Sequence, residues 1–346
     1  MIASHARAAP TRVLIVDDSP TMRAMVAHSL SRYDDIEVIG CADGPHTARA
    51  MIKALNPDVI TLDIEMPDMN GLEFLEKIMR LRPMPVVMLS TLTGRGAEAT
   101  IRALELGAFD CCEKPKQAFG EDLGDDLAEL LRTAARSPRR PRFVSTPARP
   151  VVDYEPRPDS LIAIGSSTGG VETLIELLSA FPVRCPPTVI VQHMPETYVP
   201  TFAARLDRLS APQVSVARSG APLEIGQVYV APGGTHHLEV TGGKLRRCRL
   251  VADEKMSGHR PSVDRLFLSA ARWAGPSAVG AILTGMGADG AQGLKKMKEA
   301  GAMTIGQDQD SCVVYGMPAA AQQIGAVTVQ LPLSRIAARL LSECKA

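Results

Sequence analysis

The sequence predicts an α/β protein with two domains, each built on a doubly wound parallel sheet. Short apolar runs rich in β-branched residues alternate with helix-like stretches, first over about residues 11–136 and again from residue 161 onward. Strands that alternate with helices form a parallel sheet with helices on both faces. The chain has 346 residues, which is room for about two such domains.

The first series of patterns predicts a domain over residues 11–136. Residues 20–30 predict a helix, and residues 122–136 predict a closing helix because their leucines fall on one face. The strand candidates are the apolar runs at residues 13–16, 59–62, 85–89 and 111–112.

Residues 137–158 predict an extended linker. This segment contains six prolines and five arginines. Proline at this density prevents helices and central strands, so we expect a Pro/Arg-rich spacer between two independent sheets.

The second series predicts a domain over residues 159–346. Strands and helices alternate here as in the first domain, but the two halves share no sequence repeat. Its strand candidates are residues 161–164, 188–191, 214–216, 228–230, 279–283 and 302–305.

Charge balance and cysteine spacing limit the partners and the compartment. Lys+Arg and Asp+Glu are both 38, so the formal net charge is zero, which argues against a nucleic-acid partner. The sequence has no signal-peptide pattern and no run of about 18 apolar residues, so we expect no membrane insertion. Seven cysteines without a CxxC pair favour the cytoplasm over secretion.

Three aspartates follow two of the strands predicted in the first domain. Asp17 and Asp18 come directly after the first strand, and Asp63 directly after the run at residues 59–62. The carboxyl ends of parallel strands meet at one edge of a sheet, where a hard divalent cation relieves the repulsion among carboxylates. Mg²⁺ suits such a site. Ser90 and Lys114 follow two further strands and reach the same edge.

This set of residues resembles the receiver domain of two-component response regulators, which has a flavodoxin-like fold. The motif Asp-Ile-Glu-Met-Pro at residues 63–67, the following Gly71 and the pair Lys114-Pro115 carry the resemblance. It implies that Asp63 accepts a phosphoryl group from a histidine kinase.

The same resemblance assigns roles to the neighbouring residues. Asp17 and Asp18 would hold Mg²⁺ together with Asp63, while Ser90 (with Thr91 as the neighbouring candidate) and Lys114 would contact the phosphoryl oxygens. Cys111 departs from the pattern, since receivers usually carry an aromatic residue at that position.

A glycine-rich segment at residues 165–170, Gly-Ser-Ser-Thr-Gly-Gly, follows the first strand of the second domain. A serine at such a turn lies at a helix N-terminus, where N–H groups favour negative charge. Phosphate binding, a nucleophile and a capped tight turn all fit this geometry. The GxGxxG spacing and the Walker lysine are missing, whereas GxSxG fits and selects Ser167 over Ser166.

Two further residues follow strands of the same domain and complete a Ser–His–Asp set. His193 follows the run at residues 188–191, and Asp289 lies in a glycine-rich turn after residues 279–283. A base and an acid at the same sheet edge would activate the serine.

These residues also resemble the catalytic domain of chemotaxis protein-glutamate methylesterases, a Rossmann-like domain that follows a receiver in that family. The matching motifs are at residues 165–170, 192–195, 259–264 and 283–290. The resemblance implies that Ser167 is the nucleophile, His193 the base and Asp289 its orienting acid. Backbone N–H groups of Thr168 and Met286 would form the oxyanion hole.

The implied function is a phosphorylation-regulated serine hydrolase of chemotaxis adaptation. It would demethylate glutamate γ-methyl esters and deamidate glutamines on methyl-accepting chemoreceptors, with a chemotaxis histidine kinase as phosphoryl donor. The esterase reaction would need no cofactor.

Three other interpretations remain open at this stage. The hydrolase could act on another acyl substrate under two-component control, and His259 with Asp264 is a rival acid–base pair. A DNA-binding response regulator would need a basic helix-turn-helix after the linker, where the sequence has α/β patterns instead.

Overall fold

The protein is described here by a computed structural model that covers residues 9–67, 69–90, 94–114, 124–137, 154–243 and 245–346. The chain divides into two compact units, Met1–Phe143 and Val144–Ala346.

The first unit is a five-stranded parallel sheet with strand order β2-β1-β3-β4-β5. Its elements are β1 (Thr11–Val16), α1 (Pro20–Leu30), β2 (Ile36–Ala42), α2 (Pro45–Leu55), β3 (Val59–Asp63), α3 (Gly71–Leu81), β4 (Val86–Ser90), α4 (Gly94–Leu106), β5 (Asp110–Glu113) and α5 (Gly124–Arg136). The strand order reverses between β1 and β3, which opens a crevice at their carboxyl ends.

The four strands predicted for this unit are confirmed to within two residues, and β2 is an addition. β2 is an edge strand that includes Glu37 and Gly40, and most of its residues are at least partly exposed. Its sequence therefore lacks the continuous apolar run that marks β3 and β4, which are buried along their whole length.

The second unit has a seven-stranded parallel sheet with strand order β14-β13-β12-β6-β7-β9-β8. Its strands are β6 (Leu161–Ser166), β7 (Thr188–Gln192), β8 (Gln213–Val216), β9 (Gln227–Val230), β10 (His237–Thr241), β11 (Arg247–Val251), β12 (Ala278–Ile282), β13 (Met303–Gln307) and β14 (Val329–Leu331). Its helices of seven residues or more are α6 (Gly170–Ser179), α7 (Val199–Leu209), α8 (Val263–Trp273), α9 (Ala291–Glu299), α10 (Met317–Gln323) and α11 (Leu333–Glu343).

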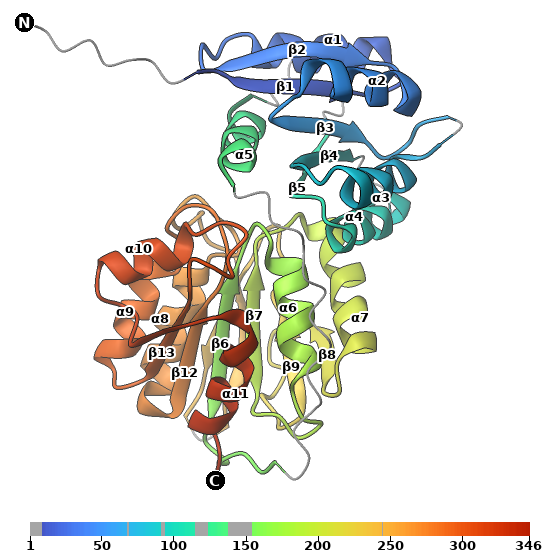
Figure 1. The fold of residues 1–346 in the computed structure, drawn as a ribbon. Coiled ribbons are helices and arrows are strands. Elements are labelled where there is room, and N and C mark those ends of the chain that lie inside the picture. Colours follow the sequence, from blue (N-terminus) through green and yellow to red (C-terminus); the bar gives the residue numbers. More distant parts are fainter. Residues whose placement is uncertain (1–8, 68, 91–93, 115–123, 138–153, 244) are drawn as a thin grey trace, which may run out of the picture. The chain divides into compact units, whose positions relative to one another are not determined.

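The strand order of this sheet reverses between β6 and β12, so the segments that follow these two strands flank a second crevice. Helices α6, α7 and α11 pack together, and α8, α9 and α10 form a second group (Figure 1). β6, β7 and β12 are buried at every residue, as expected of central strands covered on both faces.

β10 and β11 form an antiparallel hairpin outside the main sheet, which the sequence patterns did not predict. Leu238 and Val240 of β10 are fully buried, and the hairpin packs on α8. Each strand of the hairpin has five residues, and the turn between them is short. The alternation of apolar and polar residues is therefore too brief to distinguish these strands from a loop in the sequence.

The described end of the expected linker packs on the second unit. The hydroxyl of Tyr154 donates to Leu341 O at 2.8 Å, and Arg157 N donates to Cys344 O at 2.8 Å. Residues 154–158 are thus anchored at the end of α11, while residues 138–153 of the expected linker lie outside the described residues. Among the helices that the structure describes, none combines the length and the apolar character needed to cross a bilayer.

Candidate active site

The turn between β6 and α6 presents Ser167 at the carboxyl end of the sheet. Gly170 N donates to Ser167 O at 2.7 Å, which closes the turn. Gly169 has φ = 77°, a left-handed conformation that glycine adopts without strain. The strand-to-helix turn expected from the GxSxG spacing is therefore present, with α6 starting at Gly170.

The two neighbouring serines differ in their surroundings. Ser166 is fully buried, and its hydroxyl donates to Gln192 Oε1 at 2.6 Å. Ser167 is only partly buried. A nucleophile needs an accessible oxygen and a base, so the geometry favours Ser167.

Gln192, the last residue of β7, connects the serine turn to the histidine that follows the strand. Its amide nitrogen donates to Ser167 O and to His193 O, both at 2.9 Å, and its oxygen accepts from Ser166. The side chain is almost completely buried. The two hydrogen bonds donated by its amide nitrogen hold the backbones of Ser167 and His193 at a fixed separation.

His193 is partly buried and forms a hydrogen-bonded pair with the buried Asp289. His193 Nε2 lies 2.9 Å from Asp289 Oδ2, and the histidine ring stacks on that of His259 with centroids 3.9 Å apart and planes 11° apart. Within the described residues, His193 Nδ1 is buried and has no hydrogen-bond partner. The nitrogen opposite the carboxylate is therefore the one free to accept a proton.

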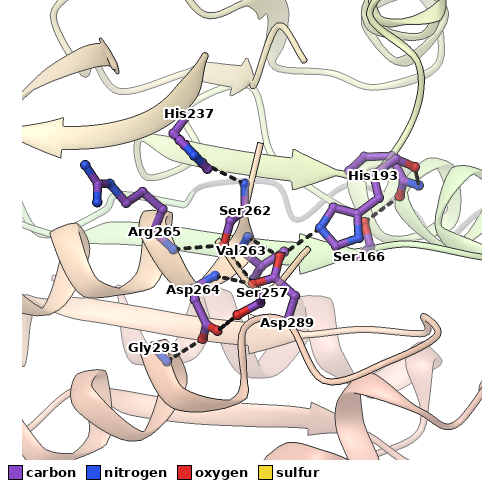
Figure 2. Close-up of polar contacts among 11 residues, drawn as sticks. Ser166, His193, His237, Ser257, Ser262, Val263, Asp264, Arg265, Asp289 and Gly293 are labelled. Carbon is purple, nitrogen blue, oxygen red and sulfur yellow. Dashed lines mark hydrogen bonds and ion pairs between the residues drawn. The ribbon is translucent and has the colours of Figure 1, made fainter. Parts of the chain in front are cut away.

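The carboxylate of Asp289 is docked on the first turn of α8 (Figure 2). Its Oδ2 accepts from Val263 N at 2.7 Å, and its Oδ1 accepts from Asp264 N at 3.0 Å and from Ser262 Oγ at 2.7 Å. Free N–H groups at a helix start are natural donors to an anion. Burial opposes ionisation here, but His193 and these donors hold the pKa of Asp289 below its ordinary value.

Asp264 lies next to this pair but has a different role in the fold. Its carboxylate accepts from Gly293 N at 2.6 Å and from Ser257 Oγ at 2.9 Å, so it links the start of α8 to α9 and to the preceding loop. Burial raises the pKa of Asp264. The ring of His259 stacks on that of His193, so His259 lies directly beside the His193–Asp289 pair.

The loop after β12 approaches the serine closely enough to contribute to an oxyanion site. A Cβ on Gly285 would lie 2.8 Å from Ser167 Cβ, so only glycine fits. Met286 is the next residue, and Thr168 follows Ser167 directly. Ser167 N itself donates to Thr284 O at 3.0 Å, so this N–H group is already engaged within the turn.

In the first unit, Asp17, Asp18 and Asp63 come together at the crevice between β1 and β3. One ligand oxygen from each lies within 4.8 Å of the others. Lys114 Nζ contacts Asp17 Oδ2 at 2.8 Å and Asp63 Oδ1 at 2.7 Å. Three carboxylates facing one ammonium group leave an excess of negative charge, so the donor set fits a hard divalent cation.

Burial determines how these charges behave. It raises the pKa of Asp63, although the contact with Lys114 acts in the opposite direction. Burial also disfavours the charged lysine, but hydrogen bonds to Asp17 and Asp63 hold the pKa of Lys114 above its ordinary value. Ser90 is buried at the end of β4, and its Oγ accepts from Thr100 Oγ1 at 3.0 Å.

The structure thus brings the residues expected from the sequence to two crevices, and it adds residues that sequence reasoning missed. Gln192 and Ser262 lie within the matching motifs, but the sequence alone indicates no role for either residue. His237 lies outside the matching motifs. Its position at the start of β10 and its hydrogen bond to Ser262 N, 3.1 Å, could not be inferred without the hairpin.

Comparisons with known proteins give matches over both units. The family model described as CheB methylesterase matches residues 162–340, and the response regulator receiver domain matches residues 13–119. A protein-glutamate methylesterase/protein-glutamine glutaminase from Rhizobium etli is 57% identical over 96% of each chain. One of the same name from Caulobacter vibrioides is 58% identical, over 96% of this chain and 98% of the other. The crystal structure of the Thermotoga maritima CheB methylesterase catalytic domain is 36% identical, covers 53% of this chain and 97% of its own, and has a TM-score of 0.52.

The lowered pKa of Asp289 predicts a pH-dependent contribution to stability. An aspartate in an unfolded chain titrates near pH ~3.9, and the folded value for Asp289 is lower. Its stabilisation is therefore complete above pH ~3.9 and is lost as the pH falls through the folded pKa. Asp289→Asn should reduce the free energy of unfolding by about 2 kcal/mol at pH 7, and the reduction should shrink towards pH ~3.

The fluorescence of Trp273, the only tryptophan of the chain, reports on the unfolding of the second unit in the full-length protein. Asp264→Asn is the matched control, because the raised pKa of Asp264 predicts the opposite trend with pH. A difference between wild type and Asp289→Asn that stays constant from pH 7 to 3 would contradict the assignment of a stabilised charge at Asp289.

Proposed function

Because the chain belongs to the CheB methylesterase family, we propose that it hydrolyses the γ-methyl esters of glutamate side chains on methyl-accepting chemoreceptors and releases methanol. The relatives that align with this chain over nearly their full length are named for this activity and for protein-glutamine glutaminase activity. The observation that carries the proposal is the His193–Asp289 pair beside the Ser167 turn, at the crevice between β6 and β12. The function is chemotaxis adaptation under phosphorylation control.

In the proposed reaction, Ser167 Oγ attacks the ester carbonyl while His193 Nδ1 takes its proton. Asp289 stabilises the imidazolium that forms and keeps the proton of His193 on Nε2. The tetrahedral oxyanion is bound by the N–H groups of Thr168 and Met286, and a well-placed donor of this kind is worth about 3 kcal/mol. His193 then protonates the departing methoxide, giving methanol and a glutamyl ester of Ser167.

Water then hydrolyses the glutamyl-enzyme, with His193 acting first as base and then as acid. His193 removes a proton from water, the resulting hydroxide attacks the glutamyl-enzyme, and the proton returns to Ser167 Oγ. The product is a free glutamate side chain. The same steps with an amide substrate release ammonia, which accounts for glutamine deamidation at a single site.

The proposal assigns the receiver crevice to phosphorylation by a chemotaxis histidine kinase. Asp63 would be the acceptor, Asp17 and Asp18 would hold Mg²⁺ with it, and Lys114 and Ser90 would contact the phosphoryl oxygens. Bound Mg²⁺ would neutralise charge on the incoming phosphoryl group. The convergence of the three carboxylates within 4.8 Å and the two contacts of Lys114 support this assignment.

We further propose domain bounds of residues 11–136 for the receiver and 159–346 for the methylesterase, with residues 137–158 between them. The contacts of Tyr154 and Arg157 fix the end of that intervening segment on the catalytic unit. The cytoplasm is the proposed location, and the seven free cysteines fit a reducing compartment.

The test of the function uses receptor-containing membranes whose glutamates carry labelled methyl esters. The full-length protein should release labelled methanol from these membranes and ammonia from receptors that carry glutamine at the same positions. Hydrolysis of small acyl esters without any release from receptors would favour a hydrolase of another substrate.

Ser167→Ala should reduce methanol release by about 10⁴-fold or more, because the remaining triad residues have no nucleophile to activate. Ser166→Ala is the matched control and should keep most of the activity, since this hydroxyl is buried against Gln192. The fluorescence of Trp273 shows whether each variant is folded. Activity lost in Ser166→Ala and kept in Ser167→Ala would reverse the assignment.

Asp63→Asn should abolish phosphate uptake from the kinase, because the amide lacks the nucleophilic oxygen. Wild type should lose uptake when Mg²⁺ is chelated. Asp43→Asn is the control, because this exposed aspartate also follows a strand but lies outside the three-carboxylate cluster. Uptake is followed with labelled phosphate, and a labelled Asp63→Asn protein would point to another acceptor.

The same variants test the regulation. Phosphorylation should accelerate methanol release by wild type and by Asp43→Asn and should leave Asp63→Asn unchanged. Equal rates before and after phosphorylation of wild type would show that the receiver does not control the esterase.

A further inference from the structure

A buried chain of hydrogen bonds leads from His193 through Asp289 to two residues outside the proposed triad. Figure 2 shows Ser262 between His237 and Asp289. Ser262 and His237 have no exposed surface, and they come from different elements, the start of α8 and the start of β10.

The contacts of His237 fix its protonation state. His237 Nε2 lies 2.8 Å from Glu254 O, and Ser262 N lies 3.1 Å from His237 Nδ1. A carbonyl oxygen can only accept a hydrogen bond and a backbone N–H can only donate one. The ring is therefore neutral, with its proton on Nε2 and a lone pair on Nδ1 directed at Ser262.

Ser262 uses its hydroxyl in two directions. As N-cap of α8, its Oγ accepts from Arg265 N at 3.3 Å. Its one hydroxyl proton is donated to Asp289 Oδ1 at 2.7 Å. An ordinary helix cap needs only the first of these hydrogen bonds, so the second serves the carboxylate.

The donors to Asp289 determine which oxygen faces the histidine. Oδ1 is bound by Ser262 Oγ and Asp264 N, while Oδ2 is bound by Val263 N and His193 Nε2. The two backbone donors belong to adjacent residues on one helical turn. Ser262 Oγ is the side-chain donor to Oδ1. Without it, Oδ1 would accept a hydrogen bond from Asp264 N alone.

We propose that Ser262 is a positioning residue of the esterase reaction, acting through Asp289 on the orientation of His193, and that His237 holds Ser262 in place. This inference rests on the proposed function of the Ser167 site. Ser262 and His237 do not touch the substrate in this scheme. Their loss therefore changes the rate of the chemical step and leaves substrate binding nearly intact.

The direct test is Ser262→Ala compared with Ser269→Ala in the full-length protein. Ser269 is also a buried serine of α8, with hydrogen bonds to Val240 N and Leu266 O, but it is remote from Asp289 in the hydrogen-bond network. We expect kcat for methanol release to fall about tenfold or more in Ser262→Ala, with KM within twofold of wild type. Ser269→Ala should keep the wild-type kcat per folded molecule.

A substitution that restores the hydroxyl separates positioning from simple stability. Ser262→Thr keeps a donor to Asp289 and an acceptor for Arg265 N, so its kcat should return to within about threefold of wild type. His237→Asn keeps an acceptor for Ser262 N, so its kcat should be higher than that of His237→Leu. A folded Ser262→Thr protein as slow as Ser262→Ala would overturn the proposal.

A second measurement does not depend on the substrate. The ring nitrogen resonances of His193 report its hydrogen bond to Asp289 and can be assigned by comparison with His193→Gln. They should shift in Ser262→Ala and stay at the wild-type positions in Ser269→Ala. If Ser262→Ala shows both the wild-type resonances and the wild-type kcat, Ser262 is a helix cap only and the inference is wrong. If the wild-type protein itself releases no methanol, the proposed function is wrong, and the resonances still test the contact between Ser262 and Asp289.

Discussion

The carboxylate of Asp289 must stay charged in a place where water does not reach it, and the catalytic unit is arranged around this requirement. A buried charge is costly unless hydrogen bonds replace its hydration. Here the first turn of α8 supplies two backbone donors and a capping hydroxyl, and His193 supplies the fourth donor. The glycine-rich loop after β12 therefore has to meet the start of α8, and the β10–β11 hairpin that packs on α8 holds that helix in position.

The two crevices use the same residue type in opposite ways. Burial raises the pKa of Asp63 in the receiver unit, and Lys114 offsets this effect in part. Asp289 is also buried, but its donors outweigh burial and lower its pKa. In the proposed roles, Asp63 is a nucleophile whose charge is open to a cation and a phosphoryl group, while Asp289 never forms a covalent bond. Asp289 has more hydrogen-bond donors around its carboxylate than Asp63 has, and this difference accounts for their different pKa shifts and proposed roles.

Local sequence patterns were sufficient to predict both parallel sheets and the strand ends that carry the candidate residues. β6, β7 and β12 are continuous apolar runs followed at once by polar or glycine-rich turns, so their residues could be assigned to one sheet edge. β2, β14 and the β10–β11 hairpin were missed because partly exposed or two-stranded elements lack such runs. The roles of Gln192, Ser262 and His237 could not be predicted, since each depends on a hydrogen bond to an element far away in the sequence.

The anchoring of Asp289 also affects how freely this part of the chain can change during evolution. Two of its four donors are the backbone N–H groups of Val263 and Asp264, which are present whatever side chains those positions carry. Only proline removes such a group. Substitutions on the exposed face of α8 therefore leave this anchor of Asp289 in place, so the helix can diverge in sequence without losing it.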